Sequence, residues 1–412
     1  MKRASMLLAA VIALLTTTTV FAADALPTAK PDAVGLSPDR LKRLGQVLQR
    51  EIDAKKIPGT VALVARKGKI AYFESFGVRD PNGSAAMTND SIFRIYSMTK
   101  PWTSLAIMML EEEGRLVLTD PVSKFLPQLK GLQVADATGR VMPAAREMTI
   151  QDLLRHTSGL AYGARTTNYF VKDAYRKADV DARELTNAEL IDRLAKVPLV
   201  HQPGTAWEYS RSTDVLGRVV EVIAGTTLGG FFQERLFGPL KMTDSGFWVA
   251  KEKHARLAGS FATDPATGNA NNLIDVTAQP RYESGGGGGV STAADYVRFA
   301  QMMLNGGQLD GQRLISRTTV RLMTADHLGK IADTMRSPGY TFGLGFAVRT
   351  DYGLGAQASS PGEFNWGGAG GTFFWVDPKE ELVAILMTQA PGPSRLYYRQ
   401  LFRQMVQQAI VD

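Results

Sequence analysis

Apolar segments with the length and composition of β-strands lie near both ends of this chain, whereas its middle has the patterns of helices and loops. Residues 60–66 and 70–76 flank a Lys-Gly-Lys turn and predict a β-hairpin. Residues 372–376 and 382–387 flank an Asp-Pro-Lys-Glu turn and predict two more strands. One sheet built from both ends, covered by terminal helices and interrupted by a helical region, is the simplest architecture for this pattern.

The pattern also predicts where the chain divides. We expect residues 24–112 and 285–412 to form the sheet domain, with residues 113–284 inserted as a mainly helical domain. A helix that begins at Ser37-Pro38 and a second one over 396–410 would be the terminal helices on the sheet.

Residues 1–23 have the features of a secretory signal peptide. Lys2 and Arg3 are followed by an apolar run, and small residues permit cleavage after Ala22 or Ala23. The apolar run is short for a membrane span, and no later segment reaches that length. We therefore expect an exported protein, periplasmic or secreted, with no membrane span after cleavage.

Composition excludes several classes of function. There is no cysteine, which rules out disulfides and thiolate metal sites. The formal net charge is +7, but no dense block of lysine and arginine occurs, so nucleic-acid binding is not expected. The four histidines lack the spacing of a metal site such as H-E-x-x-H, so no metal is expected.

Ser97 and Lys100 begin a segment of helical periodicity that runs to Gly114. Three residues apart on a helix, their side chains share a face, and a serine in the first turn lies beside free backbone N–H groups. This is the arrangement of an activated nucleophile. The alternative is an ordinary helix start with a capping serine, because S-x-x-K is common by chance.

Tyr209 and the segment 366–371 provide further candidates. Tyr209 follows a Pro-Gly loop, and a tyrosine beside a lysine can act as a base, although a packed loop tyrosine is the alternative. Glycines before the strand at 372 would let a substrate approach the backbone, where the amide of Ala369 could join that of Ser97 as an oxyanion donor. A flexible turn is the alternative there. The five glycines 285–289 lack the Gly-Lys-Ser/Thr of a nucleotide loop, which favours a turn under a packed helix.

Together these motifs resemble the serine β-lactamase and penicillin-binding-protein superfamily. Within it the chain is most similar to the family VIII carboxylesterases, relatives of the class C β-lactamases. The resemblance covers the chain from about Gly35 onward and implies an α+β fold, in which helices flank an antiparallel sheet and an all-helical region is inserted. It rests on these motifs in this order: Ser97-x-x-Lys100, Leu153-Leu154-x-His156-Thr157-Ser158-Gly159-Leu160, Tyr209-Ser210 and Trp366-Gly367-Gly368.

The resemblance also implies roles for residues. Ser97 would be the nucleophile, and Lys100 and Tyr209 would take its proton as a coupled pair, with the acceptor left open. The backbone N–H groups of Ser97 and of Ala369, as a strand residue, would form the oxyanion hole. No metal or organic cofactor is needed for this chemistry. The expected substrate contacts are Trp366, Gly367, Gly368 and Arg211.

Two departures from the class C pattern favour an esterase. Arg211 replaces the asparagine of Tyr-x-Asn, and Trp366-Gly367-Gly368 replaces Lys-Thr-Gly, whose lysine helps to bind a substrate carboxylate. We therefore expect a serine hydrolase that cleaves small, short-acyl esters through a Ser97 acyl-enzyme. A β-lactamase or D-amino-acid peptidase of the same fold, with Arg211 as substitute cation, is the second hypothesis. A non-catalytic module that binds peptidoglycan or a partner is the third.

Overall fold

The computed structural model describes residues 26–182, 184–333 and 337–412, so the predicted signal peptide lies outside the described residues. Its centre is a seven-stranded sheet in the order β11-β12-β13-β14-β15-β1-β2, and every neighbouring pair is antiparallel. The antiparallel sheet expected from the sequence is therefore confirmed. Its strands are β1 (Gly59–Arg66), β2 (Lys69–Gly77), β11 (Tyr340–Phe342), β12 (Ala347–Arg349), β13 (Phe364–Gly367), β14 (Phe373–Asp377) and β15 (Leu382–Thr388).

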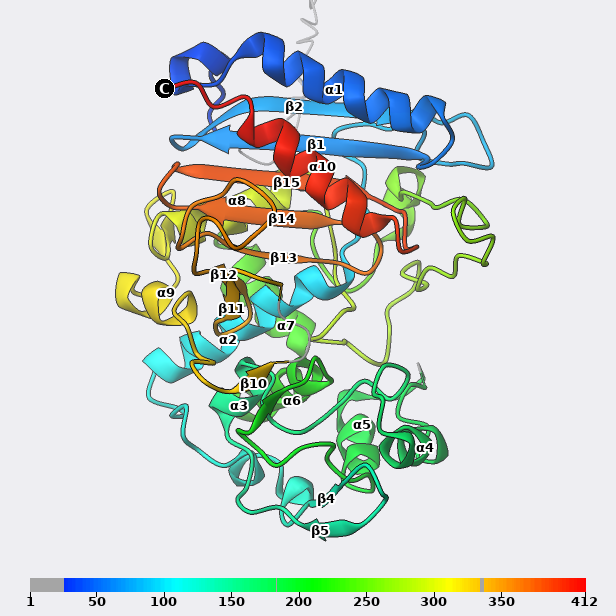
Figure 1. Cartoon of the computed structure of the whole chain (residues 1–412), viewed down its shortest axis with the longest axis vertical. Helices are drawn as coiled ribbons and strands as arrows, with labels where there is room; N and C mark the ends of the chain where they lie inside the picture. The colour runs from blue at the N-terminus through cyan, green and yellow to red at the C-terminus, as the bar shows by residue number, and fades with distance from the viewer. Residues whose placement is uncertain (1–25, 183, 334–336) are drawn as a thin grey trace, which may run out of the picture.

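The two ends of the chain meet where β1 pairs with β15. Their register places Val61 opposite Met387 and Leu63 opposite Ile385, so apolar side chains face one another along the pair except at its two ends. Figure 1 shows these two strands side by side in the middle of the upper half of the molecule. The sheet can form only after most of the chain has been made, because its two halves lie at opposite ends of the sequence.

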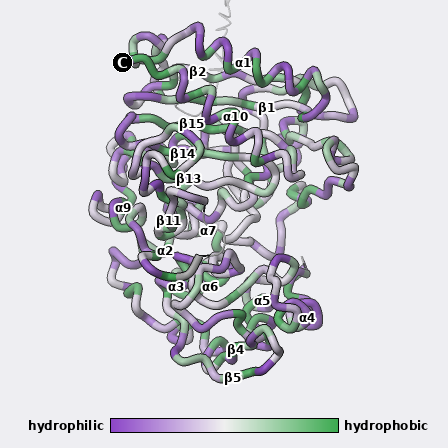
Figure 2. Tube along the Cα trace, in the orientation of Figure 1, coloured by the Kyte–Doolittle hydropathy of each residue, from purple (hydrophilic) through white to green (hydrophobic). Residues whose placement is uncertain are grey.

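Both faces of the sheet are buried under helices, which explains why its central strands are apolar at nearly every position. Alternate residues point to opposite faces. Ala62 and Val64 pack against α1 (Pro38–Asp53) and α10 (Arg395–Gln407), whereas Leu63 packs in the core that contains α2 (Lys100–Glu112) and α8 (Ala293–Leu304). Figure 2 shows the resulting hydrophobic colour along β1, β14 and β15.

A second, mainly helical region lies below the sheet (Figure 1). It also contains a short hairpin, so it is not all-helical as the family resemblance implied. The chain from 246 to 290 returns to the sheet region, where Gly246 and Val290 form a bridge. The predicted boundaries at 112/113 and 284/285 stay a prediction. The elements here are β4 (Gln133–Ala135), β5 (Val141–Pro143), α3 (Ile150–Leu154), α4 (Tyr169–Lys177), α5 (Asn187–Leu194), β6 (Ala206–Trp207), α6 (Ser212–Ala224) and α7 (Leu228–Phe232).

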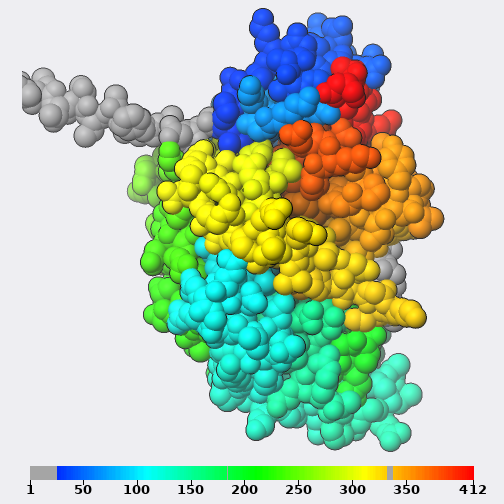
Figure 3. Space-filling view, turned by 90° about the vertical axis from the view of Figure 1, so that its left-hand side faces the viewer, coloured from blue at the N-terminus to red at the C-terminus, as the bar shows by residue number. Residues whose placement is uncertain are grey.

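The segment after α8 connects the two regions. Seen from the side, the yellow residues of α8 and α9 (Arg317–Met323) lie between the blue and orange chain ends and the cyan and green middle (Figure 3). No single helix of the described residues is long and apolar enough to cross a membrane. One helix pair, Ser212–Ala224 with Leu228–Phe237, passes by length and composition, but it is bent by 77°. The remaining strands are β3 (Phe93–Arg94), β7 (Val290–Ser291), β8 (Gln308–Leu309), β9 (Gln312–Arg313) and β10 (Ala332–Asp333).

The structure corrects the expectation for the glycine-rich segment before β14. Trp366 and Gly367 belong to a strand of their own, β13, which pairs with β12 and β14 inside the sheet. Ala369 lies in the turn between β13 and β14, not in a strand as the resemblance implied. The strands β11 to β13 have three or four residues each, too few to produce a recognisable period in the sequence.

Candidate active site

Ser97 lies in a single 3₁₀ turn, Tyr96–Thr99, that leads directly into α2. The turn begins with Tyr96 in the left-handed conformation (φ 45°), which costs a non-glycine residue about 1–3 kcal/mol and persists only where the surroundings hold it. Three hydrogen bonds do so: the Thr99 hydroxyl donates to the Tyr96 carbonyl (2.6 Å) and accepts from the Gly289 amide (2.9 Å), and the Tyr96 hydroxyl accepts from the Ile274 amide (3.1 Å). The geometry leaves the Ser97 side chain partly exposed at the start of a buried helix.

Lys100 is buried directly beneath this turn. Its Nζ donates to the hydroxyl of Tyr162 (3.0 Å) and to the carbonyl of Gly286 (2.6 Å). The same Nζ lies 4.6 Å from the centroid of the Tyr209 ring, so Lys100 contacts Tyr209 through its face. The structure thus brings Ser97, Lys100 and Tyr209 together, but the hydroxyl bonded to the lysine belongs to Tyr162, which the sequence analysis did not single out.

The surroundings of Lys100 and Tyr162 stabilise the protonated form of the lysine. Burial alone would lower the pKa of Lys100, but the electrostatic influence of Tyr162, Tyr209 and Asp214 outweighs it and raises the pKa. Burial raises the pKa of Tyr162 to about 12, although Lys100 opposes this shift. At neutral pH the resting site therefore holds a lysine ammonium and a neutral Tyr162 hydroxyl.

A fully buried carboxylate supports the lysine from below. Asp214 accepts hydrogen bonds from the Gly286 amide (3.0 Å) and the Ser284 hydroxyl (2.5 Å), and the carbonyl of Gly286 accepts from Lys100. Burial would raise the pKa of Asp214, but Arg211 and Lys100 lower it, so the group is a carboxylate. The glycine run 285–289 packs closely against α2: a Cβ at Gly285 would lie 3.0 Å from the Thr103 hydroxyl oxygen, and a Cβ at Gly289 would lie 3.0 Å from Cζ3 of Trp102.

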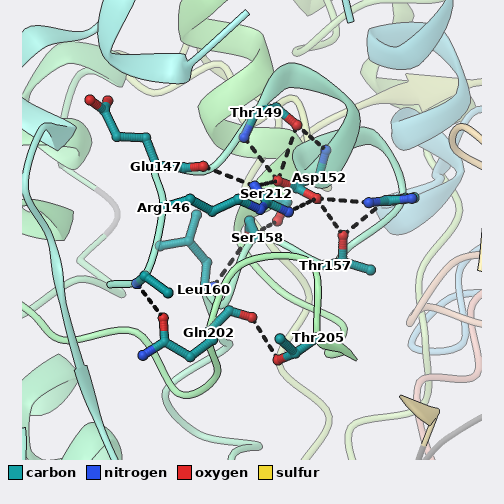
Figure 4. Close-up of polar contacts among 12 residues, drawn as sticks. Arg146, Glu147, Thr149, Asp152, Thr157, Ser158, Leu160, Gln202, Thr205 and Ser212 are labelled. Atoms are coloured by element: carbon teal, nitrogen blue, oxygen red, sulfur yellow. Dashed lines mark hydrogen bonds and ion pairs between the residues drawn. The ribbon is translucent and has the colours of Figure 1, made fainter. Parts of the chain in front are cut away.

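A network of polar contacts around Asp152 connects α3 to the first residues of the loop that leads to Tyr162 (Figure 4). This buried carboxylate caps α3 through the Thr149 amide (3.0 Å) and accepts from the Thr157 hydroxyl (2.9 Å) at the start of the loop that leads to Tyr162. Further along the loop, the hydroxyl oxygens of Ser158 and Ser212 lie 2.8 Å apart, which ties the loop to α6. These contacts fix Thr157 and Ser158, which precede Tyr162 by five and four residues.

Tyr209 lies within an aromatic cluster. The Trp366 Nε1 donates to its hydroxyl (3.4 Å), and the ring centroid of His156 lies 4.9 Å from its own. His156 is buried, with its Nδ1 3.3 Å from the Ser210 hydroxyl, and burial together with Lys100 holds its pKa well below the usual range. A neutral, packed histidine orients Tyr209 here.

Two cavities meet at Ser97, and both are also lined by Arg165, Tyr209 and Ala369. One has a volume of about 700 Å³ and is called the balanced cavity, because acidic and basic side chains both line it. The other, of about 460 Å³, is called the cationic cavity and lies between β13 and α10. The charged residues of the balanced cavity are Arg165, Asp181, Glu184, Arg211, Asp275 and Arg281; those of the cationic cavity are Arg165, Arg395, Arg399 and Arg403.

The charge of Arg211 is already neutralised. Its guanidinium bonds to Asp181, lies 3.5 Å from Asp214, and has its Cζ 5.1 Å from the centroid of the Tyr162 ring. A substitute cation for a substrate carboxylate needs a free charge, which Arg211 lacks. The hypothesis that it replaces the lysine of the class C enzymes is therefore weakened.

Comparisons with known proteins show the family and the fold of the chain. The model of a family described as Beta-lactamase matches residues 44–404. Protein Rv1367c of Mycobacterium tuberculosis is 37% identical, over 82% of this chain and 88% of the relative. Esterase EstB of Burkholderia gladioli is 32% identical, over 84% and 89%. Among solved structures, EstCE1, "a hydrolase with promiscuous acyltransferase activity", has a TM-score of 0.74 at 28% identity and covers 89% of this chain and 98% of its own.

Proposed function

Since the chain belongs to the Beta-lactamase family and has esterase relatives, we propose that it hydrolyses small, short-acyl carboxylic esters through an acyl-enzyme at Ser97. One observation carries the proposal. Ser97 opens onto two cavities, while the buried Lys100 beneath it bonds to Tyr162 and lies against Tyr209. An ester has two arms, and two cavities on either side of a nucleophile suit such a substrate.

In the first step the network of Lys100, Tyr162 and Tyr209 receives the Ser97 proton while Oγ attacks the ester carbonyl carbon. The backbone N–H groups of Ser97 and Ala369 stabilise the oxyanion, and one such donor is typically worth about 3–4 kcal/mol. The tetrahedral intermediate collapses with loss of the alcohol, which takes a proton from Tyr209. Which group first accepts the Ser97 proton is left open, because closely coupled groups titrate as a unit.

In the second step a water gives its proton to the same network and attacks the acyl carbon. The acid leaves, and Ser97 regains its proton. The cavity volumes of about 700 and 460 Å³ support small arms on both sides. The Trp366-Gly367-Gly368 motif supports the family VIII assignment, and the features of residues 1–23 support export.

A β-lactamase remains the second candidate, because the family contains such enzymes. The esterase relatives favour the esterase over it, and neither Arg211, whose charge is neutralised, nor a Lys-Thr-Gly lysine supplies the cation expected from the class C pattern. A non-catalytic binding module has no need of a buried lysine beneath an accessible serine, so it ranks third.

A serine-directed phosphonate tests the proposal. We expect a single adduct by intact-mass analysis, its absence in Ser97→Ala, and slower labelling in the presence of p-nitrophenyl butyrate. Protection by nitrocefin alone would favour a β-lactamase, and no adduct at all would favour the binding module.

A further inference from the structure

The cationic cavity has a charge composition that ester hydrolysis alone does not require. Four arginines line it beside Ser97, and no aspartate or glutamate of the described residues does. Arg403 is neutralised, because both of its terminal nitrogens donate to the buried carboxylate of Glu363. Arg165, Arg395 and Arg399 have no such ion pair within the described parts of the chain: Arg395 donates to backbone carbonyls, and the Cζ of Arg165 lies 5.4 Å from the Tyr209 ring centroid.

Arg399 is the most deeply set of these three charges. Its Nη2 donates to the carbonyl of Gly368, whereas its Nε is buried without a hydrogen-bond partner among the described residues. Burial and the charge of Arg395 lower the pKa of Arg399 to about 10, and burial and Arg165 lower the pKa of Arg395. A buried donor without an acceptor is costly, as are like charges close together. An anion in the cavity would relieve the repulsion between these cations.

Gly367 makes room for this guanidinium. A Cβ at position 367 would lie 2.5 Å from the Cζ of Arg399 and 2.8 Å from its Nη1. Any side chain there would displace the guanidinium from β13. The glycine of the Trp-Gly-Gly segment and the arginine of α10 therefore form one structural unit beside Ser97.

We propose that the cationic cavity binds a carboxylate, so that the substrates are esters with a free carboxylate on their acid or alcohol arm. The planar guanidinium group matches a carboxylate, and charge-assisted hydrogen bonds are stronger than neutral ones. The balanced cavity would hold the other, uncharged arm. The proposal rests on ester hydrolysis at Ser97 and adds the class of ester.

Two pairs of esters test the proposal and show which arm carries the anion. Ethyl hydrogen adipate is compared with ethyl adipamate, and meta-butyryloxybenzoate with meta-butyryloxybenzamide. Within each pair a carboxylate replaces a carboxamide of similar shape. We expect kcat/KM to favour the carboxylate by roughly ten- to a hundredfold in one pair. Equal kcat/KM for both members of both pairs would overturn the proposal.

Variants assign the preference to the cavity. Arg399→Met should lower the ratio of carboxylate to carboxamide turnover by about tenfold or more, and Arg399→Lys should retain part of it. Arg321→Met removes the same charge from an exposed position on α9 and should leave the ratio unchanged. General damage to the protein lowers the turnover of the carboxylate and of the carboxamide ester equally. An unchanged ratio of carboxylate to carboxamide turnover in Arg399→Met would therefore overturn the proposal.

Binding separates this proposal from the proposed hydrolysis. The Ser97→Ala protein keeps the cavity but lacks the nucleophile, and calorimetry can compare its binding of adipate and adipamide. Adipate binding that is lost in Ser97→Ala/Arg399→Met supports the anion site even if no ester is hydrolysed. No adipate binding by Ser97→Ala overturns the anion site even if hydrolysis is established.

Discussion

The two cavities at Ser97 differ in how their arginines are neutralised. In the balanced cavity Arg211 contacts two carboxylates, Asp181 and Asp214, and the nearer terminal nitrogen of Arg281 lies 3.6 Å from Glu189. In the cationic cavity Arg395 and Arg399 instead bond to backbone carbonyls. The number of arginines near a nucleophile thus says little about a ligand. An arginine that is paired with a carboxylate of the protein has a structural charge. An arginine without such a partner has a charge that is available to a substrate.

The largest effect is expected when the Ser97 hydroxyl, which both cavities share, is removed. Ser97→Ala should lower kcat by about 10⁵-fold for neutral and anionic esters alike, because both cavities open onto this one hydroxyl. Steady-state rates with the two ester pairs measure it. Residual turnover of only the anionic esters would mean that the cationic cavity has chemistry of its own.

The next effect tests a residue that lines the balanced cavity only. Tyr162→Phe removes the hydroxyl bonded to Lys100 and should lower kcat by about 10²–10³-fold for both ester classes. Tyr175→Phe is the matched control, since its buried hydroxyl accepts from the Ala161 amide in the same loop (3.1 Å). If Tyr162→Phe raised KM and left kcat unchanged, Tyr162 would be a cavity wall and not part of the proton network.

Stability should distinguish neutralised from free arginines. Arg211→Met leaves the fully buried Asp214 without its closest cation and should lower the free energy of unfolding by about 3 kcal/mol. Arg399→Met removes a charge that faces other cations, so a loss of less than about 1 kcal/mol is expected. Urea denaturation measures both. An equal loss of unfolding free energy in both variants would contradict the distinction between the neutralised Arg211 and the unpaired Arg399.

The smallest effect concerns pH. Because the pKa of Lys100 is raised, its base form is scarce at neutral pH, so kcat/KM should increase as the pH rises into the alkaline range. Asp214→Asn removes a negative charge that raises this pKa, so the acidic limb should move to lower pH by about one unit. Profiles between pH 5 and 10 with a neutral ester test this. A limb that stays in place would show that Asp214 acts only on structure.

The sequence predicted the parts of the fold that long apolar segments specify. The first hairpin, the strands around the Asp377 turn and both terminal helices were expected and are present. The strands β11 to β13 were not, because three or four residues form a strand only through their neighbours in the sheet.

Within the site, the sequence identified residues that belong to motifs and missed those defined by contact. Tyr162 is 62 residues from Lys100, and Asp214 is 72 residues from Gly286. No local pattern connects such pairs. Arg165, Arg395 and Arg399 were also missed, because only the fold shows that no carboxylate of the described residues forms an ion pair with them. A tyrosine two residues after the Ser158-Gly159-Leu160 segment was the one available indication of Tyr162.

The glycine run beneath Lys100 is not uniform, and this affects how such an enzyme could diversify. A Cβ at Gly285, Gly286 or Gly289 would come within 3.0 Å of helix residues or of Asp214, so selection should reject substitutions there. At Gly287 the nearest atoms are 3.9 Å away, and this residue lines the balanced cavity. Position 287 is thus a place where evolution or engineering can reshape the substrate space with a single codon change while leaving the support of the lysine intact.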